Sequence, residues 1–199
     1  MKISFIGAGN VAKGLGNLFV QAGHEVLYSS RTPSNNQVSI EEALKQGTIV
    51  CFAVPYNALR DLLISHRALL KEKIVVDITN AINISDWSPV LLGQETSGGE
   101  EVARLLPESR VVKAFNTIFA DTMTPEKQVF AQEKLTAFIA SDDAAAAQVV
   151  KTLANEAGFA GVIVGELKNA RYLEAMAHLN IAIALAGGGT QAGFKYFQS

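Results

Sequence analysis

The feature that most constrains the fold is a glycine-rich turn close to the amino terminus. The run Gly7-Ala8-Gly9-Asn10-Val11-Ala12 directly follows an apolar segment, Ile3 to Ile6, and opens a stretch of helical periodicity. In that context Gly7 permits a tight turn, Gly9 lets the backbone approach a pyrophosphate, and Ala12 lets the helix pack closely on the strand. The N–H groups and dipole of the new helix would face the anion. The turn therefore predicts a strand–helix unit that binds a dinucleotide.

Beyond the turn, short β-branched runs alternate with Ala- and Leu-rich stretches, a pattern typical of βαβ units and a parallel sheet. Strands are expected at residues 3–6, 25–28, 37–39, 48–54, 73–77, 110–114, 134–140 and 161–164. Helices are expected at residues 11–22, 40–45, 57–70, 99–106, 143–157 and 169–186, with a long surface loop at 85–99. The pattern predicts an α/β fold: a Rossmann-type, doubly wound, mostly parallel sheet with a small C-terminal helical extension.

The interval after the second strand is shorter than an ordinary doubly wound fold needs. Only residues 32–47 are available for it, and residues 32–36 have the composition of a turn. The remainder predicts a stub of strand and one small helix, with Ser39 as N-cap and Glu42 completing a capping box. We expect residues 1–165 to form the dinucleotide-binding domain. Residues 166–199 should form a helix and tail that complete the cleft within the same structural unit.

The end of the second strand indicates which nicotinamide cofactor is bound. An acidic residue there, about 20 residues beyond the glycine turn, would bind the ribose 2′-hydroxyl of NAD. This chain instead has Ser30 and Arg31, with no acid between Tyr28 and Thr32. Arg31 can form a bidentate pair with a 2′-phosphate, and the Ser30 hydroxyl can hydrogen-bond to it. NADP is therefore favoured over NAD, the alternative being that Arg31 is an ordinary exposed loop arginine.

Polar residues also follow three later strands. The segments Val54-Pro55-Tyr56, Asp77-Ile78-Thr79-Asn80 and Lys113-Ala114-Phe115-Asn116-Thr117 lie at expected carboxyl ends of strands. Open α/β sheets bind their ligands at that edge, so we expect these segments to line the rest of the cofactor cleft. Each segment taken alone has a simpler interpretation, as a surface aromatic, a cap or a turn former.

The composition argues against several other kinds of site. With 17 Lys and Arg against 19 Asp and Glu, the net charge is -2, and no basic run offers a footprint for nucleic acid or an anionic membrane. Cys51 is the only cysteine, which excludes an intramolecular disulfide and a cysteine-based metal cluster, and its mid-strand position predicts an inert buried thiol. His24 is expected to be solvated and His178 to pack within a helix. We expect a cytoplasmic protein, because no export signal and no apolar segment of membrane-spanning length is visible.

Several segments together resemble a known family. The match runs in order along essentially the whole chain, through residues 7–15, Ser30-Arg31, Val54-Pro55-Tyr56, Val111-Val112-Lys113-Ala114-Phe115-Asn116-Thr117 and Asn169-Ala170-Arg171-Tyr172-Leu173-Glu174. These segments resemble the NADP oxidoreductases that depend on the deazaflavin coenzyme F₄₂₀, and they are similar to the cytosolic reductase domain of transmembrane ferric reductases. The resemblance implies direct hydride transfer between the nicotinamide and a facing ring, with orientation and water exclusion supplied by the protein.

The same resemblance implies roles for individual residues. Ala8 to Val11 would hold the pyrophosphate, and Ser30 with Arg31 would hold the 2′-phosphate. Positioning residues at the nicotinamide would be Asn116 and Thr117, with no acid–base pair required, and residues 189–197 would close the second pocket. The full predicted cofactor-binding set is Gly7, Ala8, Gly9, Asn10, Val11, Ser30, Arg31, Val54, Pro55, Tyr56, Asn80, Asn116, Thr117 and Ile118.

The hydride acceptor is left open. Asn116 stands where family members that use F₄₂₀ can carry histidine, and the segment after the second strand is shorter than in those members. A deazaflavin, a flavin, a quinone-like compound or a small carbonyl or imine substrate could be the acceptor, and a regulatory module that binds NADP without turnover is the alternative class. Pyrroline-carboxylate and hydroxyacid reductases need a large helical second domain, for which the residues after Gly165 are too few.

The helix expected at residues 169–186 also suggests a partner. It is apolar around much of its circumference, and little chain follows it that could cover it. We therefore expect a homodimer formed through this helix.

Overall fold

A mostly parallel sheet organises the molecule. The structure, a computed structural model, describes residues 1–34, 36–130 and 132–198. Eight strands lie in the order β10-β9-β6-β5-β4-β1-β2-β3, and neighbouring pairs are parallel except β6 with β9. The chain passes from β1 to β2 and β3 on one side and then returns as β4 on the other side of β1. This is the predicted Rossmann topology, whose reversal point between β1 and β4 is where such sheets bind ligands.

The elements follow the predicted order closely. The strands of the main sheet are β1 (Lys2–Ile6), β2 (Glu25–Ser29), β3 (Gln37–Val38), β4 (Ile49–Phe52), β5 (Ile74–Asp77), β6 (Arg110–Ala114), β9 (Thr136–Ser141) and β10 (Ala160–Ile163). The helices are α1 (Asn10–Gln21), α2 (Ile40–Gln46), α3 (Tyr56–Leu70), α4 (Gly98–Leu105), α5 (Ala144–Glu156) and α6 (Ala170–Ile183). Short 3₁₀ turns occur at η1 (Ala120–Thr122) and η2 (Leu167–Asn169), and the π-type turn η3 (Ala184–Gly188) follows α6.

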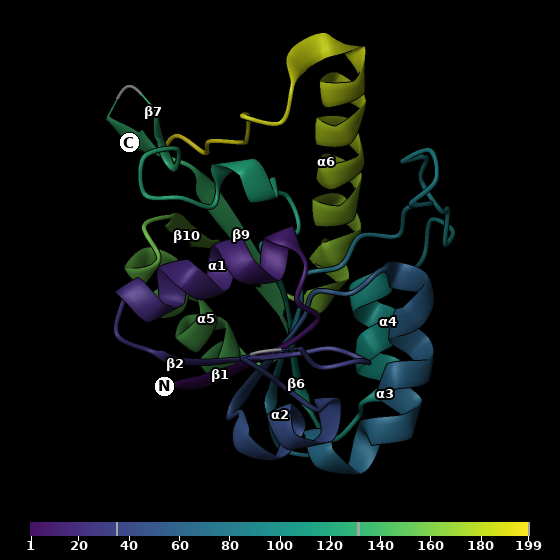
Figure 1. Ribbon diagram of the computed structural model, residues 1–199. Helices are drawn as coiled ribbons and strands as arrows, with labels where there is room; N and C mark the ends of the chain where they lie inside the picture. The colour runs from purple at the N-terminus through teal and green to yellow at the C-terminus, as the bar shows by residue number, and fades with distance from the viewer. Residues whose placement is uncertain (35, 131, 199) are drawn as a thin grey trace.

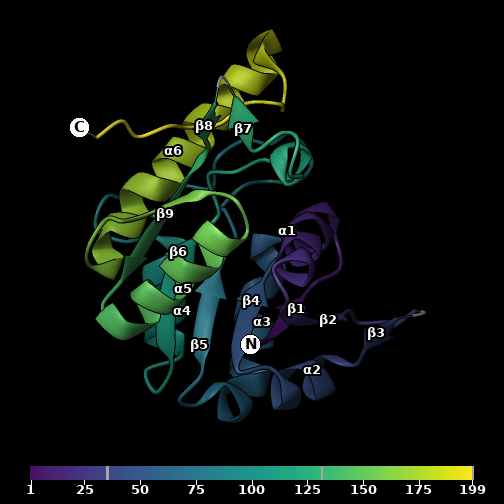
Figure 2. The ribbon, with the colours of Figure 1, turned by 90° about the vertical axis from the view of Figure 1, so that its left-hand side faces the viewer.

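Helices cover both faces of this sheet (Figure 1). On one face α1 and α5 contribute side chains such as Phe19 and Val150 to a core that includes Phe5 of β1. On the other face α2, α3 and α4 bury side chains such as Leu63 against Ile6 of the same strand. Figure 2 shows α5 in front of the sheet and α4 behind it. Because both faces are covered, β4 has the continuous apolar sequence expected of a buried parallel strand.

Three boundaries differ from the sequence prediction. The strand expected at 134–140 begins at Thr136, because a hairpin that the sequence did not predict, β7 (Val129–Phe130) with β8 (Glu133–Lys134), occupies the preceding residues. The loop expected at 85–99 ends at Ser97, whose Oγ accepts a hydrogen bond from Glu100 N and caps α4. The last helix is regular only to Ile183, after which the backbone turns at η3.

The expected capping box before α2 is half formed. Ser39 Oγ accepts from the N–H of Glu42 at 3.2 Å, as predicted. The Glu42 carboxylate, however, accepts from Gln46 Nε2 one turn further along, at 3.0 Å. The preceding turn was predicted over residues 32–36, of which Asn35 lies outside the described residues.

His24 is not the solvated residue that was expected. Its ring is only 8% exposed, and Nε2 lies 3.0 Å from Glu156 Oε2. The same ring packs edge-on against Phe19, and Nδ1 lies 3.2 Å from the N-terminal amine of Met1. The turn before β2 places the histidine over the end of α5, so it joins two elements rather than facing water.

The C-terminal segment divides into two parts with different neighbours. Helix α6 packs Leu173 against Phe138 and Ala140, the side chains of β9 that face away from α5. The tail then runs back to β9, where Phe194 O accepts from Thr136 N at 3.0 Å. Figure 1 shows α6 standing at the side of the sheet and the tail passing from its far end toward β7. Within the described residues, no helix has both the length and the apolar character needed to cross a membrane.

Candidate functional site: a two-lobed cleft at the sheet reversal

The two glycines of the turn, Gly7 and Gly9, occupy their positions for different structural reasons. Gly7 has a φ of 116°, and a Cβ there would overlap the carbonyl of Ala53 on the neighbouring strand tip. Gly9 has an ordinary φ of -77° and forms the N-cap of α1 without any side-chain hydrogen bond. A Cβ at Gly9 would meet nothing within 4 Å, so its absence leaves open space in front of the helix. The first turn of α1 also carries no acidic side chain, which keeps the positive end of its dipole available to an anion.

A cleft with two lobes opens around this turn. The first lobe, called the amide lobe here, has a volume of about 450 Å³, and the second, called the arginine lobe, has about 630 Å³. Val54, Pro55 and Ile84 line both lobes, so the two are adjacent. The amide lobe contains the predicted residues Gly9, Asn10, Val11, Val54, Pro55, Tyr56, Asn80, Asn116, Thr117 and Ile118. The arginine lobe contains Gly7, Ser30, Arg31, Val54 and Pro55, and Ala8 lies in the turn between Gly7 and Gly9 without lining either.

The arginine lobe presents a cation and hydroxyl groups. Arg31 is exposed, and the Oγ of Ser30 donates to Gln37 Oε1 at 2.8 Å, which leaves the hydroxyl oxygen able to accept or to re-orient. The opposite wall comes from α3, through Asp61 and Ser65, two residues that the sequence prediction did not include. The signal for them would have been their i, i+4 spacing on one helix face.

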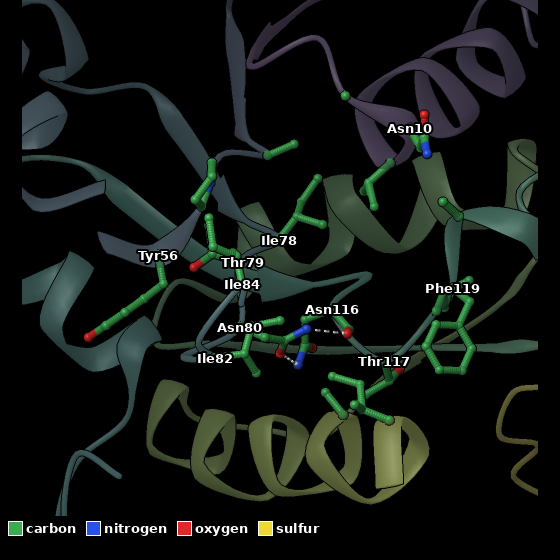
Figure 3. A pocket seen from close by; sticks show the side chains of 18 of the residues that line it. Asn10, Tyr56, Ile78, Thr79, Asn80, Ile82, Ile84, Asn116, Thr117 and Phe119 are labelled. Carbon is green, nitrogen blue, oxygen red and sulfur yellow. Dashed lines mark hydrogen bonds between the residues drawn. The ribbon is translucent and has the colours of Figure 1, made fainter. Parts of the chain in front are cut away.

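The amide lobe is named for two facing carboxamides (Figure 3). Asn80 Nδ2 donates to the backbone O of Asn116 at 2.8 Å, and Asn116 Nδ2 donates back to Asn80 Oδ1 at 3.0 Å. Asn116 Nδ2 also donates to Leu173 O of α6 at 3.0 Å. Two acceptors therefore fix the orientation of the Asn116 amide, and its Oδ1 is left buried without a donor.

A buried ion-pair network lies at the strand ends that carry these amides. The ammonium of Lys113 is 2.8 Å from Asp77 Oδ2 and 2.9 Å from Glu174 Oε1, and it donates to Thr79 O at 2.6 Å. Lys113 and Asp77 are fully buried. Burial alone would lower the pKa of Lys113, but the two carboxylates outweigh burial and hold that pKa above its usual value. Lys113 is therefore the cation of this network, which joins β5, β6 and α6.

Glu174 extends this network to a fourth element. Its two carboxylate oxygens accept from the backbone N–H groups of Gly98 and Gly99, at 2.9 and 3.0 Å, at the N-terminus of α4. Together with the bond from Asn116 to Leu173, these contacts fix α6 against the strand tips. Two of the segments that carry the family resemblance, 111–117 and 169–174, are thus in direct contact in the folded chain.

Tyr56 contributes its ring, and not its hydroxyl, to the amide lobe. Its Oη donates to Glu101 Oε2 of α4 at 3.0 Å, and Figure 3 shows the hydroxyl directed away from the two amides. Burial, followed by the hydrogen bond to Glu101, raises the pKa of this phenol. A role for Tyr56 as a proton donor is therefore disfavoured.

Two parts of the lobe wall were not predicted, and one predicted part lies elsewhere. The loop between β5 and α4 (residues 78–97) supplies Ile82, Ile84 and Trp87, and α6 supplies Ala177, Asn180 and Ile181. The tail, which was expected to close the second pocket, contributes none of its described residues to either lobe. It pairs with β9 and lines a separate cavity against the β7–β8 hairpin, because the turn at η3 directs it away from α6.

Fold and cleft together define a protein of the Rossmann fold class, and comparisons with known proteins show which members of that class it resembles. Residues 2–81 match the family described as NADP oxidoreductase, coenzyme F₄₂₀-dependent. The chain is 28% identical to the F₄₂₀-dependent NADP reductase of Methanothermobacter thermautotrophicus, over 98% of this chain and 94% of that one. A solved structure from Arthrobacter sp. FB24, provisionally described as an F₄₂₀-dependent NADP reductase, is 25% identical, with a TM-score of 0.88 and 100% of both chains covered.

A second group of relatives is longer than this chain. The human metalloreductase STEAP2 is 29% identical over 86% of this chain, and the alignment covers 35% of that protein. The chain therefore spans about a third of the length of the metalloreductases that it matches. These findings confirm the predicted resemblance to the F₄₂₀-dependent NADP oxidoreductases and to the metalloreductases.

Proposed function

We propose that this chain transfers a hydride between NADPH and a deazaflavin- or flavin-like ring bound in the amide lobe. The observation that carries the proposal is the continuity of the cleft. Arg31 lies in one lobe, the uncapped N-terminus of α1 lies between, and the paired amides lie in the other lobe. The three regions offer complements for a 2′-phosphate, a pyrophosphate and a nicotinamide, in the order in which NADP carries them.

The residues of the cleft fit that cofactor. The open space at Gly9 leaves room for a pyrophosphate against the α1 backbone, and the exposed guanidinium of Arg31 can pair with a phosphate. The orphaned Oδ1 of Asn116 needs a donor, and the carboxamide of nicotinamide carries one. A nicotinamide held there would be positioned by Asn116, whose own amide is fixed by Asn80 and Leu173.

The reaction needs little chemistry from the protein. Bound NADPH supplies the hydride: its C4–H bond breaks, the hydrogen passes to the acceptor ring with two electrons, and the reduced ring takes one proton from solvent. Pro55 and Ile78 restrict the ring on the sheet side, while Ile84 and Trp87 exclude water from the opening. Orientation and exclusion of water are therefore the roles of this wall.

The cofactor part of the proposal is tested by calorimetry with NADPH and NADH. Arg31→Ala should remove most of the preference for NADPH, a loss of about 1 to 3 kcal/mol for a charged hydrogen bond. Arg67→Ala is the matched control, because Arg67 is exposed on α3 and lines neither lobe. Equal affinities for the two cofactors in the unsubstituted chain would contradict the assignment of the arginine lobe.

The catalytic part is tested by NADPH oxidation against deazaflavin, flavins, quinones and small cyclic imines. The names of the relatives support a deazaflavin, and reduction of a flavin or deazaflavin ring is the expected result. Tight binding of NADPH with no oxidation in the presence of any acceptor would favour the alternative class, a module that senses NADP without turnover.

We also propose that a second copy of the chain covers the outer face of α6. Tyr172, Leu179 and Ile183 form an exposed stripe on this helix. Their spacing of seven and four residues places them on one side of a helix. Light scattering should report a dimer, which Leu179→Glu with Ile183→Glu should convert to a monomer; a monomeric unsubstituted chain would contradict this proposal.

A further inference from the structure

The amide lobe is lined without a single formal charge. The described residues of its wall include no Lys, Arg, His, Asp or Glu, although the lobe lies at the end of a sheet that is rich in charges elsewhere. The buried ion-pair network around Lys113 lies behind this wall and does not line it. A ligand group entering the lobe therefore meets amides, hydroxyls and apolar side chains.

Several side-chain amide N–H groups of that wall are already used. Both Asn80 and Asn116 donate to each other's segment, and Asn180 Nδ2 donates to Thr117 O at 3.2 Å. What remains toward a ligand is mainly acceptor oxygen and apolar surface. An anionic group placed beside these amides, away from the α1 N-terminus that the proposed function assigns to the pyrophosphate, would lose its hydration and gain no cation, which is unfavourable in proportion to its burial.

The opening of the lobe is apolar as well. Ile84 is 60% exposed and Trp87 is 51% exposed, both on the loop of residues 78–97. Trp87 is held in a left-handed conformation, with φ 62°, by a hydrogen bond from its N–H to Asn83 O at 2.8 Å. That conformation is costly for an aromatic residue and keeps the indole at the rim. Exposed apolar side chains gathered at a cavity mouth are typical of a ligand-binding surface.

The charges that flank this rim in the sequence are negative. Asp86 precedes Trp87, and hydrogen bonds from Ser88 keep the pKa of Asp86 below its usual value. Asp121 follows Ala120, which lines the lobe. The lysines of the tail and hairpin, Lys127, Lys134 and Lys195, line a separate cavity. The charges next to these lining residues in the chain are therefore acidic, and the cation of the cleft, Arg31, lies in the arginine lobe, which the proposed function assigns to the 2′-phosphate.

Resting on the proposed function, we infer that the hydride acceptor is recognised as an uncharged planar ring and that any anionic tail it carries stays in solvent. The wall selects for the flat apolar ring, through Ile84, Trp87 and Ile181. It adds no affinity for a phosphate or carboxylate tail. This separates the chain from a reductase that holds its acceptor by the acceptor's negative charge.

The test compares riboflavin with FMN, which share one ring and differ by a phosphate on the side chain. Binding is followed in the presence of NADP⁺ by quenching of Trp87, the only tryptophan in the chain, and turnover by NADPH oxidation. Riboflavin should bind at least about threefold more tightly than FMN at low ionic strength, with the difference shrinking as salt screens the acidic rim. The ratio of kcat/KM values should follow the ratio of affinities.

The outcomes separate the inference from the function on which it rests. If riboflavin is reduced but FMN is bound and reduced better, the uncharged-ring inference fails while hydride transfer stands. If NADPH binds and neither ring quenches Trp87 or is reduced, the proposed function fails and the inference fails with it. If FMN binds better than riboflavin and Lys127→Ala or Lys195→Ala removes that preference, the phosphate side chain of FMN reaches the separate cavity. That result also overturns the inference.

A substitution that adds a positive charge at the rim provides a second test of the inference. Ile84→Lys should shift the ratio of affinities several-fold toward FMN, because it supplies the cation that the mouth lacks. Ile84→Gln, of similar length and no charge, is the matched control and should leave the ratio unchanged. Equal shifts in the two variants would contradict the electrostatic reasoning.

Discussion

Removing the buried ammonium of Lys113 should be among the most damaging single changes to this fold. The side chain is fully buried between Asp77 and Glu174, and Lys113→Met would leave both carboxylates without their cation. Breaking a buried pair by removing one partner costs about 3 to 5 kcal/mol, because the remaining charge is desolvated and uncompensated. For a chain of this length each kcal/mol lowers the Tm by about 2 to 4 °C, so the expected fall is about 6 to 20 °C.

The assay is urea unfolding followed by circular dichroism, with Glu174→Gln completing a double-mutant cycle. Glu174→Gln alone loses the ion pair and one of two backbone contacts at Gly98 and Gly99. In the absence of Lys113 the same substitution also relieves a buried negative charge. The two changes should therefore be less than additive, with a coupling of about 0.5 to 3 kcal/mol.

An exposed ion pair supplies the control. Lys168 and Glu166 are 2.6 Å apart with both side chains more than 60% exposed, so Glu166→Gln should leave the unfolding midpoint unchanged. A loss below about 1 kcal/mol for Lys113→Met, or additive effects in the cycle, would refute the view that this network fastens α6 to the sheet.

Three further predictions concern the turn and the buried thiol. Gly9→Ala should leave the free energy of unfolding unchanged, because its Cβ has open space, but should weaken NADPH binding in calorimetry by about 1 to 3 kcal/mol. Unchanged affinity would contradict the assignment of the space at Gly9 to the pyrophosphate. Gly7→Ala should instead lower the urea midpoint, since φ 116° and the Ala53 carbonyl both exclude a Cβ, and a wild-type midpoint would refute this. Burial raises the pKa of Cys51, so the stability present below the unfolded-state pKa of about 8.5 should fall as pH rises beyond it, by up to about 1.4 kcal/mol per pH unit. Cys51→Ala should reduce this loss of stability at high pH, as measured by urea unfolding at a series of pH values. The same pH dependence in the variant and the unsubstituted chain would contradict the prediction.

Local sequence signals predicted the fold well, and most of the residues they singled out line one of the two lobes of the cleft. The turn at residues 7–12 encodes its own geometry, and Ser30 is followed directly by Arg31 just past the end of β2, so both could be recognised from adjacent residues. Cys51 was predicted as a buried thiol, and the structure confirms that it is 1% exposed. Each of these depends on neighbours within a few positions, for which periodicity and turn chemistry are informative.

The remainder depends on contacts between distant segments. The rim residues Ile84 and Trp87 belong to a loop whose sequence is typical of any surface loop, and Ile181 could equally have been buried against another helix. The course of the tail is decided at η3, where Gly187 has a φ of 100° and redirects the chain toward β9. Several consecutive glycines are compatible with many directions, so the error about the tail could not have been avoided from sequence alone.

One signal was present and could have been used. Lys113 stands between Val112 and Ala114, and Glu174 stands between Leu173 and Ala175. A charge at a buried position requires a partner of opposite sign. Pairing the two would have predicted the contact between segments 111–117 and 169–174, and with it the docking of α6 beside the strand tips.

That contact also explains why the family resemblance leaves the acceptor open. In the two specific segments, Lys113 and Glu174 face each other, and the Asn116 amide is held by Asn80 and Leu173. These side chains determine where α6 lies and therefore how wide the amide lobe is. A lobe of that width would accept any planar ring. The side chains that would face an acceptor, Ile84, Trp87 and Ile181, lie outside both segments. Substitutions at those three positions should therefore alter the choice of acceptor without altering the fold, whereas substitutions in the shared segments should alter the fold first.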